Sequence, residues 1–221
     1  MNATPHLVVA IDGPAASGKS TVARLVAGRL GFLYVNSGAM YRAFTWLALE
    51  RGIDCRDRAA VVAMLDSAVV DCGESGGAGV IRLDGREAGD EIHSPAVNAN
   101  VSAIAAIPEV RSRLLGALRA YAETADVVME GRDIGTVVFP DTPHKFYIDA
   151  SPEIRQARRR SQGMEDSVTD RDRQDSSRDT APLAVADDAV VIDSSDRGID
   201  EVVDLVLERL DADGVTPRRA A

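Results

Sequence analysis

The chain has 221 residues, of which 45% are hydrophobic and 27% charged, a balance typical of a globular domain with a substantial core. Its formal net charge of −10 argues against a protein that grips a nucleic-acid backbone, and no apolar stretch approaches the roughly 18 residues of a membrane-spanning helix. The first residues lack the basic start and small-residue cleavage site of a secretory signal. We therefore expect a cytoplasmic protein without nucleic-acid or membrane partners.

The cysteines and histidines give no sign of a disulfide framework or of a metal site. Two cysteines, Cys55 and Cys72, are too few for either in a chain of this length, and we expect both to be reduced thiols. The three histidines, His6, His93 and His144, are scattered without the spacing of metal ligands. Any catalytic chemistry therefore has to be sought in other residue types.

The first fifty residues alternate between strand and helix patterns. Residues 7–12 are apolar and β-branched, which predicts a buried strand, and a glycine-bearing loop follows at 13–18. Apolar residues then recur at helical spacing over 19–30 and 37–50, with a short apolar run at 32–35 between them. This order predicts a strand, a loop, a helix, a second strand and a second helix.

The chain changes character between residues 68 and 93. After a short predicted helix at 58–67, glycines separate two short apolar runs, and Asp84-Gly85 marks a tight turn. This texture predicts a small antiparallel β insertion. A long helical pattern follows at 95–124 and is interrupted at Pro108.

The second half of the chain returns to the alternation of strands and helices. Strands are predicted at 126–129 and 145–148, followed by a helix that starts at Pro152 and ends in three arginines at 158–160. Residues 161–181 are polar and charged, with almost no apolar periodicity. A last strand and a last amphipathic helix are predicted at residues 189–192 and 199–210. The alternation predicts an α/β fold with a parallel central sheet covered by helices on both faces.

One motif carries a specific chemistry. Residues 13–20, Gly-Pro-Ala-Ala-Ser-Gly-Lys-Ser, fit G-x-x-x-x-G-K-[ST] at every fixed position and lie between a predicted strand and a predicted helix. Its glycines let backbone N–H groups point at phosphate oxygens, and the helix N-terminus adds a partial positive charge. Lys19, one of two lysines among 25 basic residues, would reach the β- and γ-phosphates, and the Ser20 hydroxyl would ligate Mg²⁺. The predicted ATP-binding residues are Gly13, Pro14, Ala15, Ala16, Ser17, Gly18, Lys19, Ser20 and Thr21.

The P-loop alone does not define a reaction. GTPases carry a guanine-reading N-K-x-D motif, and the chain contains none. Motor and transport ATPases are normally longer and have a separate coupling surface. A chain of 221 residues with a P-loop therefore favours a kinase that acts on a small molecule.

Three further segments combine arginines with other polar residues. The first is N-S-G-A-M-Y-R at 36–42, the second is E-G-R-D-I-G-T-V-V-F-P at 130–140, and the third is R-D-R-Q-D-S-S-R at 171–178. The first two follow predicted core strands. Because ligands gather at the carboxyl ends of strands in an open α/β sheet, we expect both segments to lie next to the P-loop.

Together with I-D-G-P-A-A-S-G-K-S at 11–20, these segments closely resemble the bacterial cytidylate kinases, and the resemblance runs over residues 8–210. The family is cytoplasmic and usually monomeric, and it transfers the γ-phosphate of ATP to CMP or dCMP with Mg²⁺. The resemblance implies a three-layer P-loop kinase fold. The glycine-rich segment at 68–93 resembles the enlarged nucleotide-binding insertion of that family.

The resemblance also implies roles for individual residues. The positions that read cytosine in the family fall on Ser37, Arg111 and Asp133. The ribose contacts fall on Ser102, Arg171 and Asp175, and the phosphate contacts on Tyr41, Arg42, Arg132 and Arg178. Lys19, Arg42, Arg132 and Arg178 would provide the positive charge for catalysis.

The implied division of the chain gives the polar segment a function. Residues 1–67, 94–160 and 182–210 would form the core P-loop kinase domain, 68–93 the small β insertion, 161–181 a lid and 211–221 a flexible tail. The stretch 161–170 is shorter than the usual lid of the family. Arginines on a lid make physical sense, because closure brings them over the phosphates, where they neutralise charge and expel water.

Several of these residues also have simpler interpretations. Capping the helix that follows could be the sole role of Ser37, and Arg111 could be a solvated charge on a helix surface. Arg132 and Asp133 could pair with each other, and the alternating charges of 170–179 could be a solvated loop. At the level of function, the alternatives are another small P-loop kinase, acting on UMP, shikimate or dephospho-coenzyme A, and a nucleotide-gated binding module.

Overall fold

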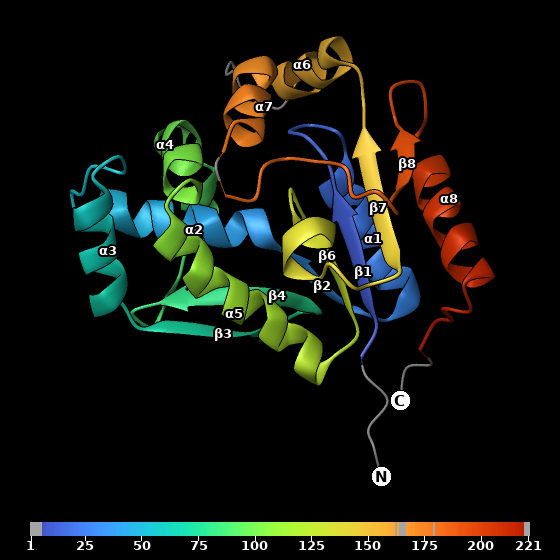
Figure 1. Cartoon of the computed structure of the whole chain (residues 1–221), viewed down its shortest axis with the longest axis horizontal. Helices are drawn as coiled ribbons and strands as arrows, with labels where there is room; N and C mark the ends of the chain where they lie inside the picture. Colours follow the sequence, from blue (N-terminus) through green and yellow to red (C-terminus); the bar gives the residue numbers. More distant parts are fainter. Residues whose placement is uncertain (1–5, 162, 164–166, 179, 219–221) are drawn as a thin grey trace.

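The core of the protein is a sheet built around one fully buried strand. The computed structural model describes residues 6–161, 163, 167–178 and 180–218. Five parallel strands form the central part of the sheet in the order β2-β6-β1-β7-β8 (Figure 1). These strands are β1 (Val8–Asp12), β2 (Leu33–Asn36), β6 (Val127–Gly131), β7 (His144–Asp149) and β8 (Val190–Asp193). The predicted α/β fold with a parallel central sheet is confirmed.

Helices cover both faces of the sheet, because alternate residues of each strand point to opposite sides. On one face, Val9, Ile11 and Val128 pack against α1 (Lys19–Leu30) and α8 (Ile199–Ala212). The other face packs against a larger apolar cluster to which three long helices contribute. These helices are α2 (Ser37–Glu50), α4 (Pro95–Ala105) and α5 (Pro108–Thr124). The molecule therefore has three layers.

The predicted antiparallel insertion extends this sheet. After α3 (Arg58–Ser67), β3 (Val70–Ser75) and β4 (Ala78–Leu83) pair antiparallel, and the short β5 (Arg86–Glu87) pairs with β4. A single parallel bridge, Tyr34 to Ala78, joins β4 to β2. The antiparallel pairing that the sequence predicts is confirmed, and the hairpin forms an outer edge of the central sheet.

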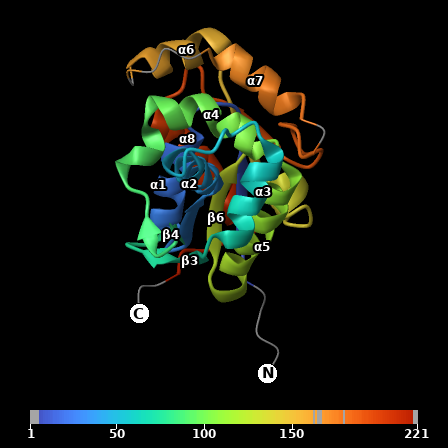
Figure 2. The ribbon, with the colours of Figure 1, turned by 90° about the vertical axis from the view of Figure 1, so that its left-hand side faces the viewer.

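The polar segment after residue 160 contains a helix that the sequence did not predict. Figure 2 shows α6 (Pro152–Ser161) and α7 (Val168–Ser176) lying across one end of the molecule. The Ser167 side chain caps α7 by accepting a hydrogen bond from the backbone N–H of Asp170. Val168 is the buried apolar residue of α7, so the helix shows no periodic pattern. Residues 162, 164–166 and 179, which belong to the predicted lid, lie outside the described residues.

The end of the chain packs against the amino edge of the sheet. The sequence predicts a flexible tail from residue 211, but α8 continues to Ala212 and Val215 is buried in the apolar cluster beside α1. The backbone N–H of Arg218 donates to the Leu30 carbonyl at 2.9 Å. The tail as far as residue 218 is therefore docked, and residues 219–221 lie outside the described part of the chain. Within that part, every helix is too short or too polar to cross a membrane.

Candidate active site

The turn between β1 and α1 has a backbone that most side chains would prevent. A Cβ atom on Gly13, whose φ is +151°, would lie 2.1 Å from the Ile148 carbonyl oxygen. Ala16 and Gly18 also have positive φ values, 61° and 90°. Such a backbone turns successive N–H groups inward, and α1 begins directly after it. The predicted P-loop therefore forms an anion-binding turn at the helix N-terminus.

Lys19 is buried at the start of α1. Its ammonium donates a hydrogen bond to the Pro14 carbonyl at 2.9 Å. Burial, and after it the charge of Arg132, lower the pKa of Lys19 to about 7, although the charge of Glu130 opposes this shift. An anionic ligand would stabilise this ammonium, so the site is electrostatically suited to a phosphate. Ser20, the next residue, is exposed.

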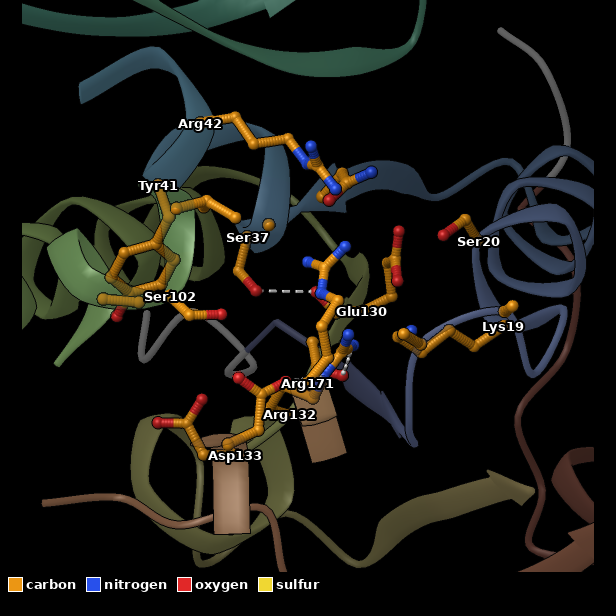
Figure 3. Close-up of a pocket in the computed structure, with 18 of the residues that line it drawn as sticks. Lys19, Ser20, Ser37, Tyr41, Arg42, Ser102, Glu130, Arg132, Asp133 and Arg171 are labelled. Atoms are coloured by element: carbon orange, nitrogen blue, oxygen red, sulfur yellow. Dashed lines mark hydrogen bonds and ion pairs between the residues drawn. The ribbon is translucent and has the colours of Figure 1, made fainter. Parts of the chain in front are cut away.

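A cavity of about 290 Å³ opens beside the P-loop and extends to the three segments at 36–42, 130–140 and 171–178. Figure 3 shows Lys19 and Ser20 on one side of it, and Ser37, Tyr41 and Arg42 of α2 on the other. The predicted residues that line it are Ala15, Ala16, Gly18, Lys19, Ser20, Thr21, Ser37, Tyr41, Arg42, Ser102, Arg111, Arg132, Asp133, Arg171, Asp175 and Arg178. The remaining predicted residues, Gly13, Pro14 and Ser17, are buried in the loop behind the cavity.

Ser37 does not cap α2. Asn36 is the capping residue, and its side chain accepts a hydrogen bond from the backbone N–H of Ala39 at 2.9 Å. The Ser37 hydroxyl instead donates to the Glu130 carbonyl at 2.8 Å (Figure 3), which ties α2 to the end of β6. The interpretation of Ser37 as only a helix cap is therefore wrong.

Arg111 and Asp133 form a buried ion pair on the acceptor side of the cavity. The two side chains are 8% and 6% exposed. The guanidinium carbon of Arg111 also lies 5.6 Å from the centre of the Tyr41 ring. Burial raises the pKa of Asp133, although Arg111 opposes that shift. The interpretation of Arg111 as a solvated surface charge is wrong.

Helix α7 contributes Asp175 to the lining of the cavity. Arg132 Nε lies 2.9 Å from Asp175 Oδ2, and Arg178 pairs with the same carboxylate. Burial alone would raise the pKa of Asp175, but these two arginines hold it below its ordinary value. Arg132 therefore pairs with Asp175 of α7, and the expectation that it could pair with Asp133 is wrong. The segment around 171–178 is also more than a solvated loop.

The sequence did not single out two further residues of the cavity. Glu130 is 2% exposed and accepts a hydrogen bond from the Tyr34 hydroxyl at 3.1 Å. Arg159 is 4% exposed and lines the cavity from α6. Arg155 and Arg159 are both buried, and their spacing of four residues places them on one side of α6. The sequence does not separate Arg159 from Arg158, because both lie within one helical turn of Arg155.

A P-loop and a set of arginines that line the same cavity define a P-loop phosphotransferase with a phosphorylated acceptor. The sequence as a whole assigns the protein to a family more specifically than the site does. A family model described as "Cytidylate kinase" matches residues 9–212, and the chain belongs to the cytidylate kinase family.

Individual relatives agree with this assignment. A cytidylate kinase of Pelotomaculum thermopropionicum is 44% identical, and the match covers 96% of this chain and 98% of that protein. A cytidylate kinase of Streptomyces avermitilis is 41% identical, with 92% of each chain covered. The crystal structure of an uncharacterized protein from Eubacterium ventriosum is similar in fold, with a TM-score of 0.50 and 13% identity over 94% of this chain and 99% of the other.

Proposed function

We propose that the protein transfers the γ-phosphate of ATP to CMP and dCMP, giving ADP and CDP or dCDP, with Mg²⁺ bound to the donor. Its membership of the cytidylate kinase family supports this function. The observation that carries the choice of acceptor is the buried pair of Arg111 and Asp133, at the end of the cavity away from the P-loop. We infer in addition that it acts as a cytoplasmic monomer.

The pair offers a hydrogen-bonding pattern that suits cytosine. Cytosine has an amino donor at C4 and acceptors at N3 and O2. The Asp133 carboxylate can accept from the amino group, and the Arg111 guanidinium can donate to the acceptors. Uracil presents the opposite pattern, with an acceptor at O4 and a hydrogen on N3, so it would place like groups against each other. The sugar does not change this edge, which is why dCMP is included.

The chemistry requires positive charge rather than a base. A nucleoside monophosphate has a second phosphate pKa of about 6, so its attacking oxygen is already deprotonated at neutral pH. The obstacle is the repulsion between two anions. Lys19 lies on the donor side, Arg42 and Arg132 lie on the acceptor side, and the lid adds Arg171 and Arg178. These cations offset the repulsion and hold the two phosphates in line.

The residues near the P-loop fit a Mg²⁺ ion. Mg²⁺ prefers oxygen ligands and keeps several of its waters. The Ser20 hydroxyl lines the cavity, and the buried Glu130 carboxylate lies on the same face of β6 as Val128, the face that packs against α1. Ser20 would bind the ion directly, and Glu130 would bind its waters. When bound with the nucleotide, the ion would neutralise charge on the phosphate oxygens.

A coupled assay of ADP release tests the proposal. The acceptors are CMP, dCMP, UMP, AMP, shikimate and dephospho-coenzyme A, each with Mg-ATP, and a reaction without acceptor measures hydrolysis. We expect turnover with CMP and dCMP to exceed that with the other acceptors. Faster turnover with another acceptor, or ADP release that no acceptor stimulates, would contradict the proposal.

A further inference from the structure

Asp12 lies between the P-loop and the segment that follows β6. It is the last residue of β1, it directly precedes Gly13 of the P-loop, and it is 5% exposed. On the neighbouring strand, β6, the aligned residue is Gly131. The polypeptide after Gly131 carries Arg132 and Asp133, which line the acceptor side. A buried carboxylate at this junction needs partners, because burial without them is costly.

Both oxygens of this carboxylate bind the acceptor segment. Asp12 Oδ1 accepts a hydrogen bond from the backbone N–H of Ile134 at 2.9 Å, and Oδ2 accepts one from Gly135 at 2.7 Å. These N–H groups open η2 (Ile134–Val138), a single wide turn of helix. The first N–H groups of any helix lack partners within it, so Asp12 satisfies two of them from another strand.

The start of η2 is also tightly packed beside this contact. A Cβ atom on Gly135 would be in ordinary van der Waals contact with Asp12 Oδ2, at 3.5 Å, but would crowd Cδ of Lys145, at 3.1 Å. Asp133, which precedes η2, has an unusual backbone, with φ −148° and ψ 24°. The Asp12 contacts therefore fix the two residues that directly follow Arg132 and Asp133.

We propose that Asp12 is a positioning residue that couples the donor side of the site to the acceptor side. By holding the start of η2, it sets the place of Arg132 and Asp133 relative to the P-loop that begins one residue after Asp12 itself. Asp12 touches neither reactant and acts through these two side chains. The inference rests on the proposed function, because it assigns Arg132 and Asp133 to acceptor binding.

The Asp12→Asn variant tests the coupling. It keeps the shape of the side chain, but its amide group would set an NH₂ against one of the two backbone N–H groups. A hydrogen bond to a charged group is worth about 1.5–3 kcal/mol, which converts to about a tenfold to hundredfold effect. We expect kcat/KM for CMP to fall by about this factor, while the Kd for ATP without an acceptor changes by less than about threefold.

Two comparisons make the outcome specific. Asp126→Asn is the matched control, because Asp126 is also a buried aspartate that accepts a backbone N–H, from Leu7 at 2.8 Å, but at the amino edge of the sheet. We expect Asp126→Asn to lower thermal stability without affecting kcat/KM for CMP more than the Kd for ATP. Gly135→Ala disturbs the start of η2 independently of Asp12, because the added Cβ would crowd Cδ of Lys145 at 3.1 Å, so it tests the proposal even if Asp12→Asn does not fold. We expect it to raise the KM for CMP more than the KM for ATP.

The possible results separate the two proposals. Equal effects of Asp12→Asn on CMP and ATP, or a folded variant with wild-type kinetics, would overturn the coupling role. If Asp12→Asn does not fold, equal effects of Gly135→Ala on the two KM values would do the same. A wild-type enzyme that prefers another acceptor would contradict the proposed function alone. The variants are then measured with that acceptor, and the same comparison with ATP decides the role of Asp12.

Discussion

The guanidinium of Arg111 and the carboxylate of Asp133 meet in a buried ion pair, although they are 22 residues apart and come from α5 and the segment after β6. The pair joins two elements that both line the acceptor side of the cavity. Removing one partner of such a pair leaves the other charge buried, which typically costs about 3–5 kcal/mol of stability. A substitution that keeps the shape is therefore the informative one.

Asp133→Asn should reduce the discrimination between CMP and UMP. A site built on specific hydrogen bonds can reject a mismatched base by about 10⁴-fold, because its buried polar groups are left unpaired. Asparagine can donate as well as accept, so the variant should lose activity with CMP and tolerate UMP better. The measurement is kcat/KM for CMP, dCMP and UMP. Wild-type use of UMP within about tenfold of CMP would show that this pair does not read the base.

ATP binding should take up a proton at alkaline pH. Burial lowers the pKa of Lys19 to about 7, so its amine is mostly neutral at about pH 8.5 before the nucleotide binds. The phosphates are fully ionised there, because their pKa is about 6, and they raise the pKa of the amine. Titration calorimetry in two buffers of different ionisation enthalpy measures the uptake. It should shrink towards pH 6, where the amine is already protonated.

Lys19→Met serves as the control for that uptake and as a test of catalysis. It should abolish the proton uptake while the protein stays folded. It should also lower kcat by about a hundredfold or more, because electrostatic contacts of this kind are typically worth about 3 kcal/mol. If the variant kept the wild-type kcat at saturating ATP, Lys19 would have no role in catalysis.

Arg42→Ala and Arg132→Ala should each raise the KM for CMP more than the KM for ATP. Both side chains line the acceptor side of the cavity, and a lost arginine–phosphate contact costs about 1.5–3 kcal/mol. Lysine should not restore either activity, because it lacks the planar fork of arginine. Arg58→Ala is the matched control, since Arg58 is exposed and pairs with Glu109. The measurement is steady-state kinetics with each substrate varied. An equal rise in the KM for CMP and the KM for ATP would contradict this assignment.

The docked tail should contribute to stability. Val215 is 3% exposed, and truncating it to alanine removes about two carbons from the core, worth about 1.5–3 kcal/mol with the cavity that remains. Val69→Ala is the control, because Val69 is 67% exposed and should change stability by less than about 0.5 kcal/mol. Chemical denaturation of both variants provides the comparison. If Val215→Ala and Val69→Ala had equal free energies of unfolding, the packing of the tail would not contribute to stability.

The sequence predicted those parts of the protein whose signals are local. Each core strand contains a short apolar run, the P-loop needs its glycines at fixed spacing, and the segment from Ser37 to Arg42 follows β2 directly. The order of these elements was enough to place the site at the carboxyl ends of the strands. Such predictions need only the pattern of residues that are close together in the sequence.

Contacts between distant segments could not be predicted in the same way. Helix α7 is polar, and it is held by contacts such as that of Asp172 with Arg155 at 2.6 Å, which pair residues from two helices. Whether Glu130 faces α1 depends on the register of β6, and whether the chain beyond Ala212 is docked depends on the cluster that receives Val215. These features arise from the packed structure rather than from local composition.

The two ends of the described chain are fastened to one side chain. Asp126 Oδ1 accepts the backbone N–H of Leu7 at 2.8 Å, and its other oxygen pairs with Arg218. The described chain thus closes almost into a ring, with its seam at the amino edge of the sheet, whereas the P-loop that lines the cavity follows the carboxyl end of β1. A circularly permuted protein, with the seam linked and new ends opened at the exposed turn of Gly76 and Gly77, should keep the cavity intact.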